Sequence, residues 1–553
     1  MSNSETPYVT RTPRERSRHM RSNGWKVLGI ATALALVGGA CTDPTVAPQS
    51  TLTTANFFQD PNSYKEYLAK IYLGLAVGGQ NGGDGATDIQ GIDGGFSQYL
   101  RLYWELEELP TDEAVIAWGD QTLPEINTQG WNASNTFVNA MYYRIYFQVG
   151  MVNEFLRQTT DAVLASRGVG ASLKTTIQTY RAEARFMRAL SYWHGLDLFG
   201  SIPLVKETDA IGAAAPKQAT RAEIYNYVVS ELNDIRTQLP VAGPAPDAAT
   251  YGRATQGAAD MLLAELYLNA GVYTGTADYA DALASASNVI NSGLYQLNPV
   301  YKNNFTADNN ISPEMIFAVA EDGQHTQTYG STNFIIHAAC GNSMNAGDYG
   351  VDGCWYGLRM KPSAVDLYSA GDARGASIFT GGGQVEGVAS ISNFGDGYPN
   401  PKYTNKTSTG GNGSNPPFAD TDFPMFRLAE AYLIYAEANI RGGGGSGATA
   451  LGYVDSLRSR AYGDTLHGVP SGAFTVDTIL AERGRELMWE AHRRTDLVRY
   501  GLFTGGTYIW AWKGANAYGS DSTGVATDSH LDVYPLPANE LIANPNLKQN
   551  TGY

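Results

Sequence analysis

The spacing of apolar residues in three long stretches constrains the fold of this chain more than any other feature. The stretches cover residues 137–198, 221–290 and 425–500, and apolar side chains recur in them every three or four positions, which is typical of amphipathic helices. The stripes comprise Phe137, Met141, Ile145 and Val149; Ile224, Val228, Leu232 and Ile235; Ala280, Ala284 and Val289; and Leu428, Ala431, Tyr432 and Tyr435. The chain is therefore expected to be mainly α-helical.

The predicted helices are each about 15–20 residues long and follow one another in antiparallel-looking pairs. Such pairs are typical of a tetratricopeptide-like scaffold, which we place at about 137–295 and 425–500; an irregular all-helical domain is the alternative. Two insertions rich in Gly, Trp and Tyr lie at about 78–135 and 301–424. Loops of this length are usually functional or disordered, and aromatic residues argue against disorder. We therefore expect a helical scaffold that presents a ligand site on irregular loops.

Residues 1–40 differ in character from the rest of the chain. A basic stretch precedes an apolar run at 27–37, and the small residues Gly38-Gly39-Ala40 then lead to Cys41. This order predicts a secretory signal, and its end resembles a bacterial lipobox with Cys41 as the lipidated residue. An ordinary signal peptide with a coincidental cysteine is the alternative. The predicted organisation is a lipoprotein signal peptide at 1–40, a tether at 41–54 and a single domain at 55–553.

The charge of the chain limits its partners. The formal net charge is −16, and removal of residues 1–40, which carry six basic and two acidic residues, leaves −20. So acidic a protein is not expected to bind nucleic acid or anionic headgroups by charge. Membrane attachment then depends on the lipid itself.

Three cysteines are present, and lipidation of Cys41 leaves Cys340 and Cys354. In an oxidising compartment such a pair predicts a disulfide; two unpaired thiols are the alternative. We predict no metal site and no cofactor, because no Cys/His cluster has ligand spacing. Asp84, Asp88 and Asp93 lie among glycines, but their spacing does not match an EF-hand loop.

Several segments carry a family resemblance, and they occur in a fixed order along the chain. They are AEARFMRAL at 182–190, LFGSIPLV at 198–205, GRAT at 252–255, FRLAEAYLI at 426–434, ERGREL at 482–487 and YPLP at 534–537. Together they resemble the SusD/RagB family of outer-membrane nutrient-binding lipoproteins. The resemblance implies a protein anchored in the outer membrane and facing the cell exterior. It further implies capture of an oligosaccharide and delivery to a TonB-dependent transporter of the SusC type, without catalysis.

Aromatic residues in the two insertions are the candidate ligand contacts, because sugar rings stack on flat aromatic faces. The candidates are Trp118, Trp131 and Asp112 in the first insertion, and Tyr349, Trp355 and Tyr356 around the predicted disulfide in the second. Trp104, within the apolar segment 102–106, is expected in the core. A disulfide beside Trp355 would order that ring before binding.

The residues leave other functions open, among them a pure interaction scaffold, which the helix pairs would allow. A peptide ligand, as in RagB-like members, is an alternative within the family. A glycoside hydrolase would need two carboxylates, and Asp112 and Glu113 are the candidates in an aromatic loop. Glu486 and Glu490 are spaced for intrahelical ion pairs with Arg493 and Arg494; between packed helices these charges would need full pairing.

Overall fold

The computed structural model describes residues 54–553 except positions 81, 84, 213 and 244. The predicted signal peptide, Cys41 and all but the last residue of the predicted tether lie outside the described residues. Residues 58–553 form one compact unit, whereas helix α2 (Thr54–Phe57) belongs to a separate unit.

Helices dominate the larger unit. The longer ones are α3 (Ser63–Ala76), α4 (Tyr99–Glu108), α6 (Thr136–Gln158), α8 (Ala171–Phe199), α9 (Arg221–Ile235), α10 (Gln256–Leu268), α12 (Tyr279–Asn291), α15 (Leu428–Ile440), α16 (Gly447–Tyr462) and α17 (Val476–Glu486). The shorter ones are α5 (Leu123–Ile126), α7 (Asp161–Ser166), α11 (Ala270–Thr274), α13 (Ser331–Ala338), α14 (Pro362–Val365), α18 (Arg493–Arg499) and α19 (Ala538–Ala543). No helix in the described part of the chain is both long and apolar enough to cross a membrane.

The helix ends are set by local capping, and the buried faces follow the predicted stripes. Asn135 accepts hydrogen bonds from the first backbone amides of α6, and Thr220 with Glu223 forms a capping box on α9. The predicted stripes on α6 and α9 are buried. On α12 the prediction was right for Val289, which is buried, and wrong for Ala280 and Ala284, which are exposed; Ala282 and Ala286 are buried in their place.

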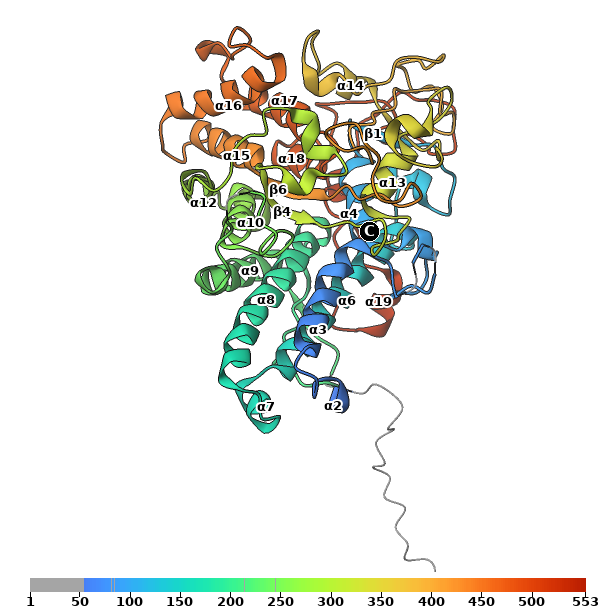
Figure 1. Ribbon diagram of the computed structural model, residues 1–553. Helices are drawn as coiled ribbons and strands as arrows, with labels where there is room; N and C mark the ends of the chain where they lie inside the picture. Colours follow the sequence, from blue (N-terminus) through green and yellow to red (C-terminus); the bar gives the residue numbers. More distant parts are fainter. Residues whose placement is uncertain (1–53, 81, 84, 213, 244) are drawn as a thin grey trace, which may run out of the picture. The chain divides into compact units, whose positions relative to one another are not determined.

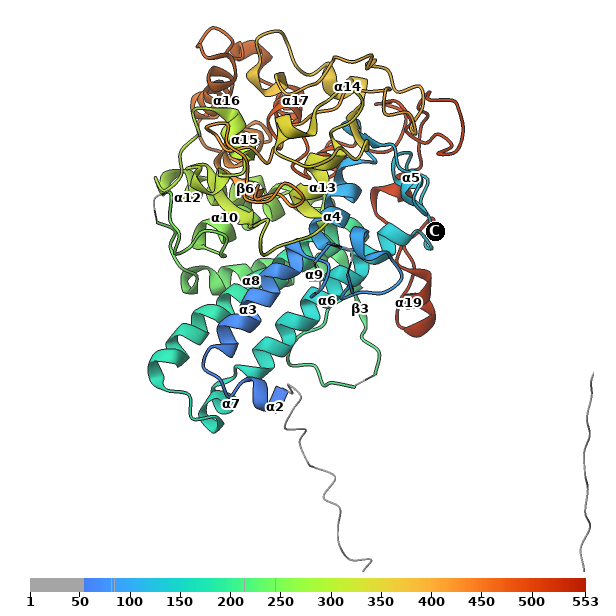
Figure 2. The same ribbon diagram turned by 45° about the vertical axis from the view of Figure 1, so that its right-hand side comes forward.

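The helices form a continuous layered scaffold. Helices α3, α6 and α8 lie side by side, and α9, α10, α12, α15 and α16 continue the array by neighbour-to-neighbour packing (Figure 1). Helices α13 and α14 of the second insertion lie on the side of the unit away from α12 (Figure 2), and α13 contacts α4. The mainly helical fold predicted from the sequence is confirmed.

Strands are short and serve to join distant segments. They are β1 (Ala114–Ile116), β2 (Ile202–Pro203), β3 (Gln218–Ala219), β4 (Met315–Val319), β5 (Leu358–Met360) and β6 (Phe423–Arg427). They pair antiparallel as β1–β5, β2–β3 and β4–β6. The β1–β5 pair ties the first insertion to the second.

The first insertion contributes to the core as well as to the surface. Helix α4 lies inside it, and every residue of this helix is buried. Trp104 is fully buried, and its ring nitrogen donates to the backbone oxygen of Trp489 at 3.0 Å. The expectation that Trp104 lies in the core is confirmed.

Glu486 and Glu490 do not pair with Arg493 and Arg494 along one helix. Helix α17 ends at Glu486 and α18 begins at Arg493, with left-handed backbone at Trp489 and Ala491 (φ 61° and 63°) between them. Among the residues that the structure describes, the expected ion pairs of Glu486 and Glu490 with Arg493 and Arg494 do not form. These charges instead join distant segments through pairs of 2.6–3.2 Å: Glu490 with Lys402 and Arg427, Arg493 with Asp112, and Arg494 with Asp197 and Glu107. Full pairing of this kind is what burial of charge requires.

Candidate functional site

The pairing of β1 with β5 brings the two insertions together. Ile116 lies opposite Leu358 in the register, and the ladder extends by one hydrogen bond from the Ala117 amide to the Gly357 oxygen at 2.9 Å. Two antiparallel strands that continue past this point carry their next residues side by side. Trp118 follows β1 and Trp355 precedes β5, so the pairing places the two rings next to one another.

A cleft of about 590 Å³ opens at this junction. Its walls carry four aromatic side chains, each only partly buried: Phe96, Trp118, Tyr329 and Trp355. The exposed carboxylates of Asp93 and Asp120 and the guanidinium of Arg101 complete the lining. A concave surface with apolar rings and a few polar groups is the usual form of a small-molecule site.

The rings of the cleft are tilted relative to one another. The centroids of Trp118 and Trp355 are 6.4 Å apart with an interplanar angle of 46°, and the indole nitrogen of Trp118 donates to the Trp355 backbone oxygen at 2.9 Å. Tyr329 meets Trp355 edge-to-face at 5.8 Å and 78°. Phe96 meets Trp118 edge-to-face at 6.5 Å and 77°. The aromatic wall is therefore bent rather than flat.

Arg101, on α4, supplies the cationic part of the cleft. Its guanidinium lies 4.2 Å from the ring centroids of Phe96 and Phe334, a distance at which cation–π attraction is favourable. Its Nη1 donates to the backbone oxygens of Gly95 and Tyr329 at 2.8 and 2.9 Å, and its Nε to Glu105 at 3.0 Å. The remaining nitrogen, Nη2, has no hydrogen-bond acceptor among the described residues.

Burial shifts the pKa values of both Arg101 and Glu105. Burial lowers the pKa of Arg101, against the opposing charge of Glu105. Burial also raises the pKa of Glu105 to about 7, although Arg101 opposes the shift. The Arg101–Glu105 pair therefore sits in a poorly hydrated wall of the cleft, where hydrogen bonds to a ligand are strong.

Trp355 is held in place before any ligand arrives. Its ring stacks on His337 of α13 at 4.4 Å and 19°, and its amide donates to the His337 backbone oxygen at 2.8 Å. The disulfide between Cys340 and Cys354 closes the loop next to it. The predicted disulfide is confirmed, and it adjoins the cleft. Ordering the ring in advance lowers the entropy cost of binding.

The other candidate contacts in the second insertion lie outside this cleft. Tyr356 is 48% exposed and packs edge-to-face on Phe394 at 5.6 Å, but it is not part of the cleft lining. Tyr349 lines a separate cavity. The structure thus brings Trp118 and Trp355 together and leaves Tyr356 and Tyr349 apart from them.

Asp112 and Trp131, predicted as ligand contacts, are buried. Arg493 and Tyr508 each bind the Asp112 carboxylate at 2.6 Å, and their effect lowers its pKa although burial alone would raise it. The Trp131 ring is 4% exposed and donates to the Tyr553 hydroxyl at 2.8 Å. Glu113 is 2% exposed. None of the three lines the cleft, because helix α4 draws the surrounding segment into the core.

Phe96, Arg101 and Tyr329 are cleft residues that sequence reasoning missed. Phe96 and Tyr329 each stand beside a glycine, Gly95 and Gly330, in segments without long helices, and this was the one signal in the sequence. Arg101 gave none, since an arginine on an apolar helix is usually a partner of a nearby carboxylate.

One group of side chains could hold a metal ion, and it lies away from the cleft. Glu265, Glu430 and His492 offer ligand atoms within 4.8 Å of one another, all buried in the helical core. Burial and the charge of Glu265 raise the pKa of Glu430 well above its usual range, so a proton shared by the two carboxyls fits the same geometry. Among the aspartates considered for calcium, Asp84 is not described and Asp88 pairs with Lys70 at 2.9 Å.

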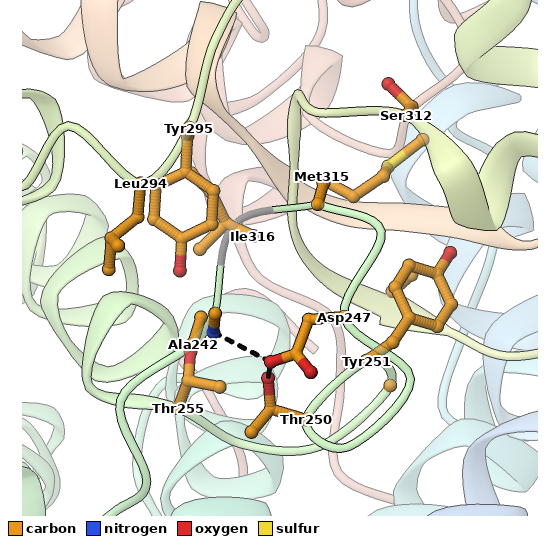
Figure 3. A pocket seen from close by; sticks show the side chains of 14 residues that line it. Ala242, Asp247, Thr250, Tyr251, Thr255, Leu294, Tyr295, Ser312, Met315 and Ile316 are labelled. Carbon is orange, nitrogen blue, oxygen red and sulfur yellow. Dashed lines mark hydrogen bonds between the residues drawn. The ribbon is translucent and has the colours of Figure 1, made fainter.

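A smaller hollow lies between the 242–255 segment and β4 (Figure 3). Leu294, Tyr295 and Ile316 form much of its wall. Its charged group, Asp247, already accepts hydrogen bonds from the amides of Gly243 and Ala249 and from the Thr250 hydroxyl. With its carboxylate occupied, this hollow is a weaker candidate than the aromatic cleft.

Known structures share this fold. Surface glycan-binding protein A from Bacteroides thetaiotaomicron, in complex with laminarihexaose, matches with a TM-score of 0.64 at 20% identity, over 88% of this chain and 98% of that one. A SusD superfamily protein from the same organism matches with a TM-score of 0.68 at 21% identity, over 89% and 99%. At these identities the likeness concerns the fold.

Sequence relatives carry the assignment further. Residues 379–553 match a model of the SusD family. SusD-like protein P2 of Formosa agariphila is 26% identical, over 78% of this chain and 83% of that protein. Starch-binding protein SusD of Bacteroides thetaiotaomicron is 34% identical over 97% of this chain and 100% of that protein. The resemblance inferred from the ordered segments is confirmed, and the chain belongs to the SusD family.

Proposed function

We propose that this protein binds a glycan at the cell surface in the aromatic cleft and leaves it chemically unchanged. The observation that carries the proposal is the set of partly exposed rings of Phe96, Trp118, Tyr329 and Trp355 around one cavity. Pyranose faces stack on such rings. Asp93 and Asp120 can accept hydrogen bonds from sugar hydroxyls, and Arg101 places a positive charge in the same lining.

A starch-like α-glucan is the glycan we favour. The sequence relative with 34% identity is named a starch-binding protein. The tilt of 46° between the indoles of Trp118 and Trp355 gives a bent wall, which suits a curved α-glucan better than a flat, extended chain. Relatives named as binding proteins, and the burial of Asp112 and Glu113 away from the cleft, support binding without hydrolysis.

Calorimetric titration of the purified protein with maltoheptaose tests the proposal. Trp355→Ala and Trp118→Ala are each expected to weaken binding roughly tenfold to a hundredfold, as loss of a stacking face at the centre of a site does. Tyr356→Ala is the matched control, because its ring neighbours Trp355 in sequence and lies outside the cleft; its affinity should stay within twofold. Equal loss in all three variants, or no loss in either Trp variant, contradicts the site.

Parallel titrations decide between ligand classes. Laminarihexaose and a mixed peptide pool are offered under the same conditions as maltoheptaose. Tight peptide binding with no glycan binding would establish the RagB-like alternative. Release of reducing sugar that is abolished by Asp112→Asn would establish the hydrolase alternative.

Delivery and anchoring form the second part of the proposal. We infer that the signal peptide at 1–40 is removed, that lipidated Cys41 and the tether at 41–54 hold the domain at 55–553 on the outer membrane, and that the glycan passes to a TonB-dependent transporter of the SusC type. Membership of the SusD family supports this arrangement. Cys41→Ser should release the protein from the membrane fraction, and tagged wild-type protein should co-purify with a transporter.

A further inference from the structure

A second cavity of about 590 Å³ lies among three segments of the second insertion. It is lined by the 3₁₀ helix η3 (Tyr301–Phe305), the 373–379 segment that begins with η6 (Ala373–Gly375), and the 401–410 loop, with Tyr349 beside them. It shares no lining residue with the aromatic cleft. The second cavity is therefore separate from the aromatic cleft.

Two lysines on this cavity lack an acidic partner. The Lys302 ammonium donates to the backbone oxygens of Pro401 and Lys402, each at 2.7 Å, and the Lys406 ammonium donates to the side-chain oxygen of Asn412 at 2.6 Å. Among the residues that the structure describes, no carboxylate oxygen pairs with either of them. Lys302 is partly buried and lines the cavity, so less water surrounds its charge than surrounds that of an exposed lysine.

The neighbouring cations of the same lining show the contrast. Lys402 pairs with Glu490 at 2.6 Å, and Arg374 pairs with Glu482 at 2.6 Å. These two are neutralised from within the protein, whereas Lys302 and Lys406 are not. Burial, followed by the nearby charge of Lys402, lowers the pKa of Lys302 to about 7. An anion in the cavity would supply the missing counter-charge and remove that penalty.

The rest of the lining fits a sugar. Tyr349 and Phe379 are partly buried and offer aromatic faces. The hydroxyls of Ser377 and Ser408 donate to Asn400 and Asp308, so their oxygens remain free to accept hydrogen bonds from sugar hydroxyls. Stacking faces, hydroxyl acceptors and ammonium groups on one cavity match a pyranose that carries a carboxylate.

We propose that this cavity is a second saccharide site that takes an acidic sugar, such as a uronate, with Lys302 and Lys406 as its counter-charges. Tyr349, a ligand candidate from the sequence, acts here rather than in the aromatic cleft. The site would let one protein hold a neutral glycan stretch and a uronate-bearing stretch at different points. It stands independently of the aromatic cleft, because the two linings do not overlap.

Calorimetric titration with tri-galacturonate at pH 6, with maltotriose as the uncharged match, tests this site. Wild-type protein should bind tri-galacturonate, Lys302→Met should weaken binding at least tenfold, and Lys406→Met should weaken it several-fold. Trp355→Ala should leave it within twofold. Lys302→Met removes the hydrogen-bond donor of two backbone oxygens, so the thermal unfolding of each variant is recorded. Lys406→Met loses only one surface contact. It therefore still tests the site if Lys302→Met is unstable.

Three outcomes of these titrations each overturn the proposal, in addition to the peptide and pH results below. They are the absence of tri-galacturonate binding by the wild-type protein, unchanged binding in both lysine variants, and loss of binding in Trp355→Ala alone. A tri-glutamate peptide is titrated alongside; if it binds as well as tri-galacturonate, the site recognises carboxylates without selecting a sugar, and the assignment is wrong.

Raising the pH from 6 to 8.5 provides an independent check. The uronate stays ionised over this range, whereas Lys302, with a pKa of about 7, loses its charge. Lys402, whose pKa burial lowers to about 8, loses charge in the same direction. The other charged groups of the lining are Arg374, Lys406 and Asp348. Burial would lower the pKa of Arg374, but its carboxylate partners raise it well above the usual value, so Arg374 keeps its charge. Affinity should therefore fall with rising pH, and a constant affinity contradicts the role of Lys302.

Discussion

The aromatic cleft and the buried ion-pair network around Glu486 use arginine in opposite ways. In the network, Arg374, Arg427 and Arg460 all contact the Glu486 carboxylate, and each of these side chains is at most 4% exposed. In the cleft, Arg101 pairs with Glu105, and its Nη2 has no acceptor among the described residues. Several guanidinium groups around one carboxylate fix how segments pack, whereas Arg101 pairs with one carboxylate and lines an open cleft beside half-exposed rings.

Glu486→Gln should have the largest effect on stability. The substitution keeps the shape of the side chain but leaves three arginines with one fewer counter-charge in the interior, and breaking a buried pair costs about 3–5 kcal/mol. Urea unfolding at pH 7 measures the loss. Maltoheptaose affinity of the folded fraction should be unchanged, since Glu486 does not line the cleft.

Asp234→Asn is the matched acid-to-amide control for that variant. Asp234 pairs with Arg185 at 2.7 Å but is 61% exposed, and exposed pairs contribute about 1 kcal/mol or less. If both variants lose the same free energy of unfolding, burial of the network does not set its contribution and the comparison fails.

Glu105→Gln should show that the free energy of unfolding depends on pH differently in the aromatic cleft and in the ion-pair network. Burial raises the pKa of Glu105 from 4.5 to about 7, so the folded state binds this proton more tightly than the unfolded state. The contribution of Glu105 to stability therefore falls as pH rises from 4.5 to 7, by about 2–3 kcal/mol. Glutamine cannot titrate, so the variant should gain that amount relative to wild type between pH 5 and pH 8 in urea unfolding.

Glu486 provides the contrasting sign for the same measurement. Burial would raise its pKa, but Arg460, Arg427 and Arg374 overcome that effect and hold the pKa well below its ordinary value. Its stabilisation is present above the unfolded-state pKa and is lost only as pH falls below it. The difference between wild type and Glu486→Gln should hence stay constant from pH 5 to pH 8. A parallel change in both variants would show that the two carboxyls share one environment.

The same contrast explains which features could be predicted from the sequence. The helices of the scaffold follow local apolar spacing, so Phe137 and Ile224 were placed correctly on buried faces. Asp112 and Trp131 were misplaced because loop-like composition does not reveal burial. Tyr329 was missed because its place in the cleft depends on a contact between segments more than 200 residues apart, the hydrogen bond from Arg101 to its backbone oxygen, and no local pattern encodes such a contact.

Tyr329→Phe should have the smallest effect and asks whether the cleft binds by stacking or by hydrogen bonding. The Tyr329 ring meets Trp355 at 5.8 Å and stacks on Phe418 at 5.6 Å, so phenylalanine preserves the ring and its support. If stacking dominates, maltoheptaose affinity should change by less than about twofold, or 0.4 kcal/mol, whereas Tyr329→Leu should lose roughly tenfold. Equal losses in the two variants would mean that the hydroxyl carries the contact. The cleft would then resemble the ion-pair network, because its specificity would come from satisfied polar groups rather than from exposed rings.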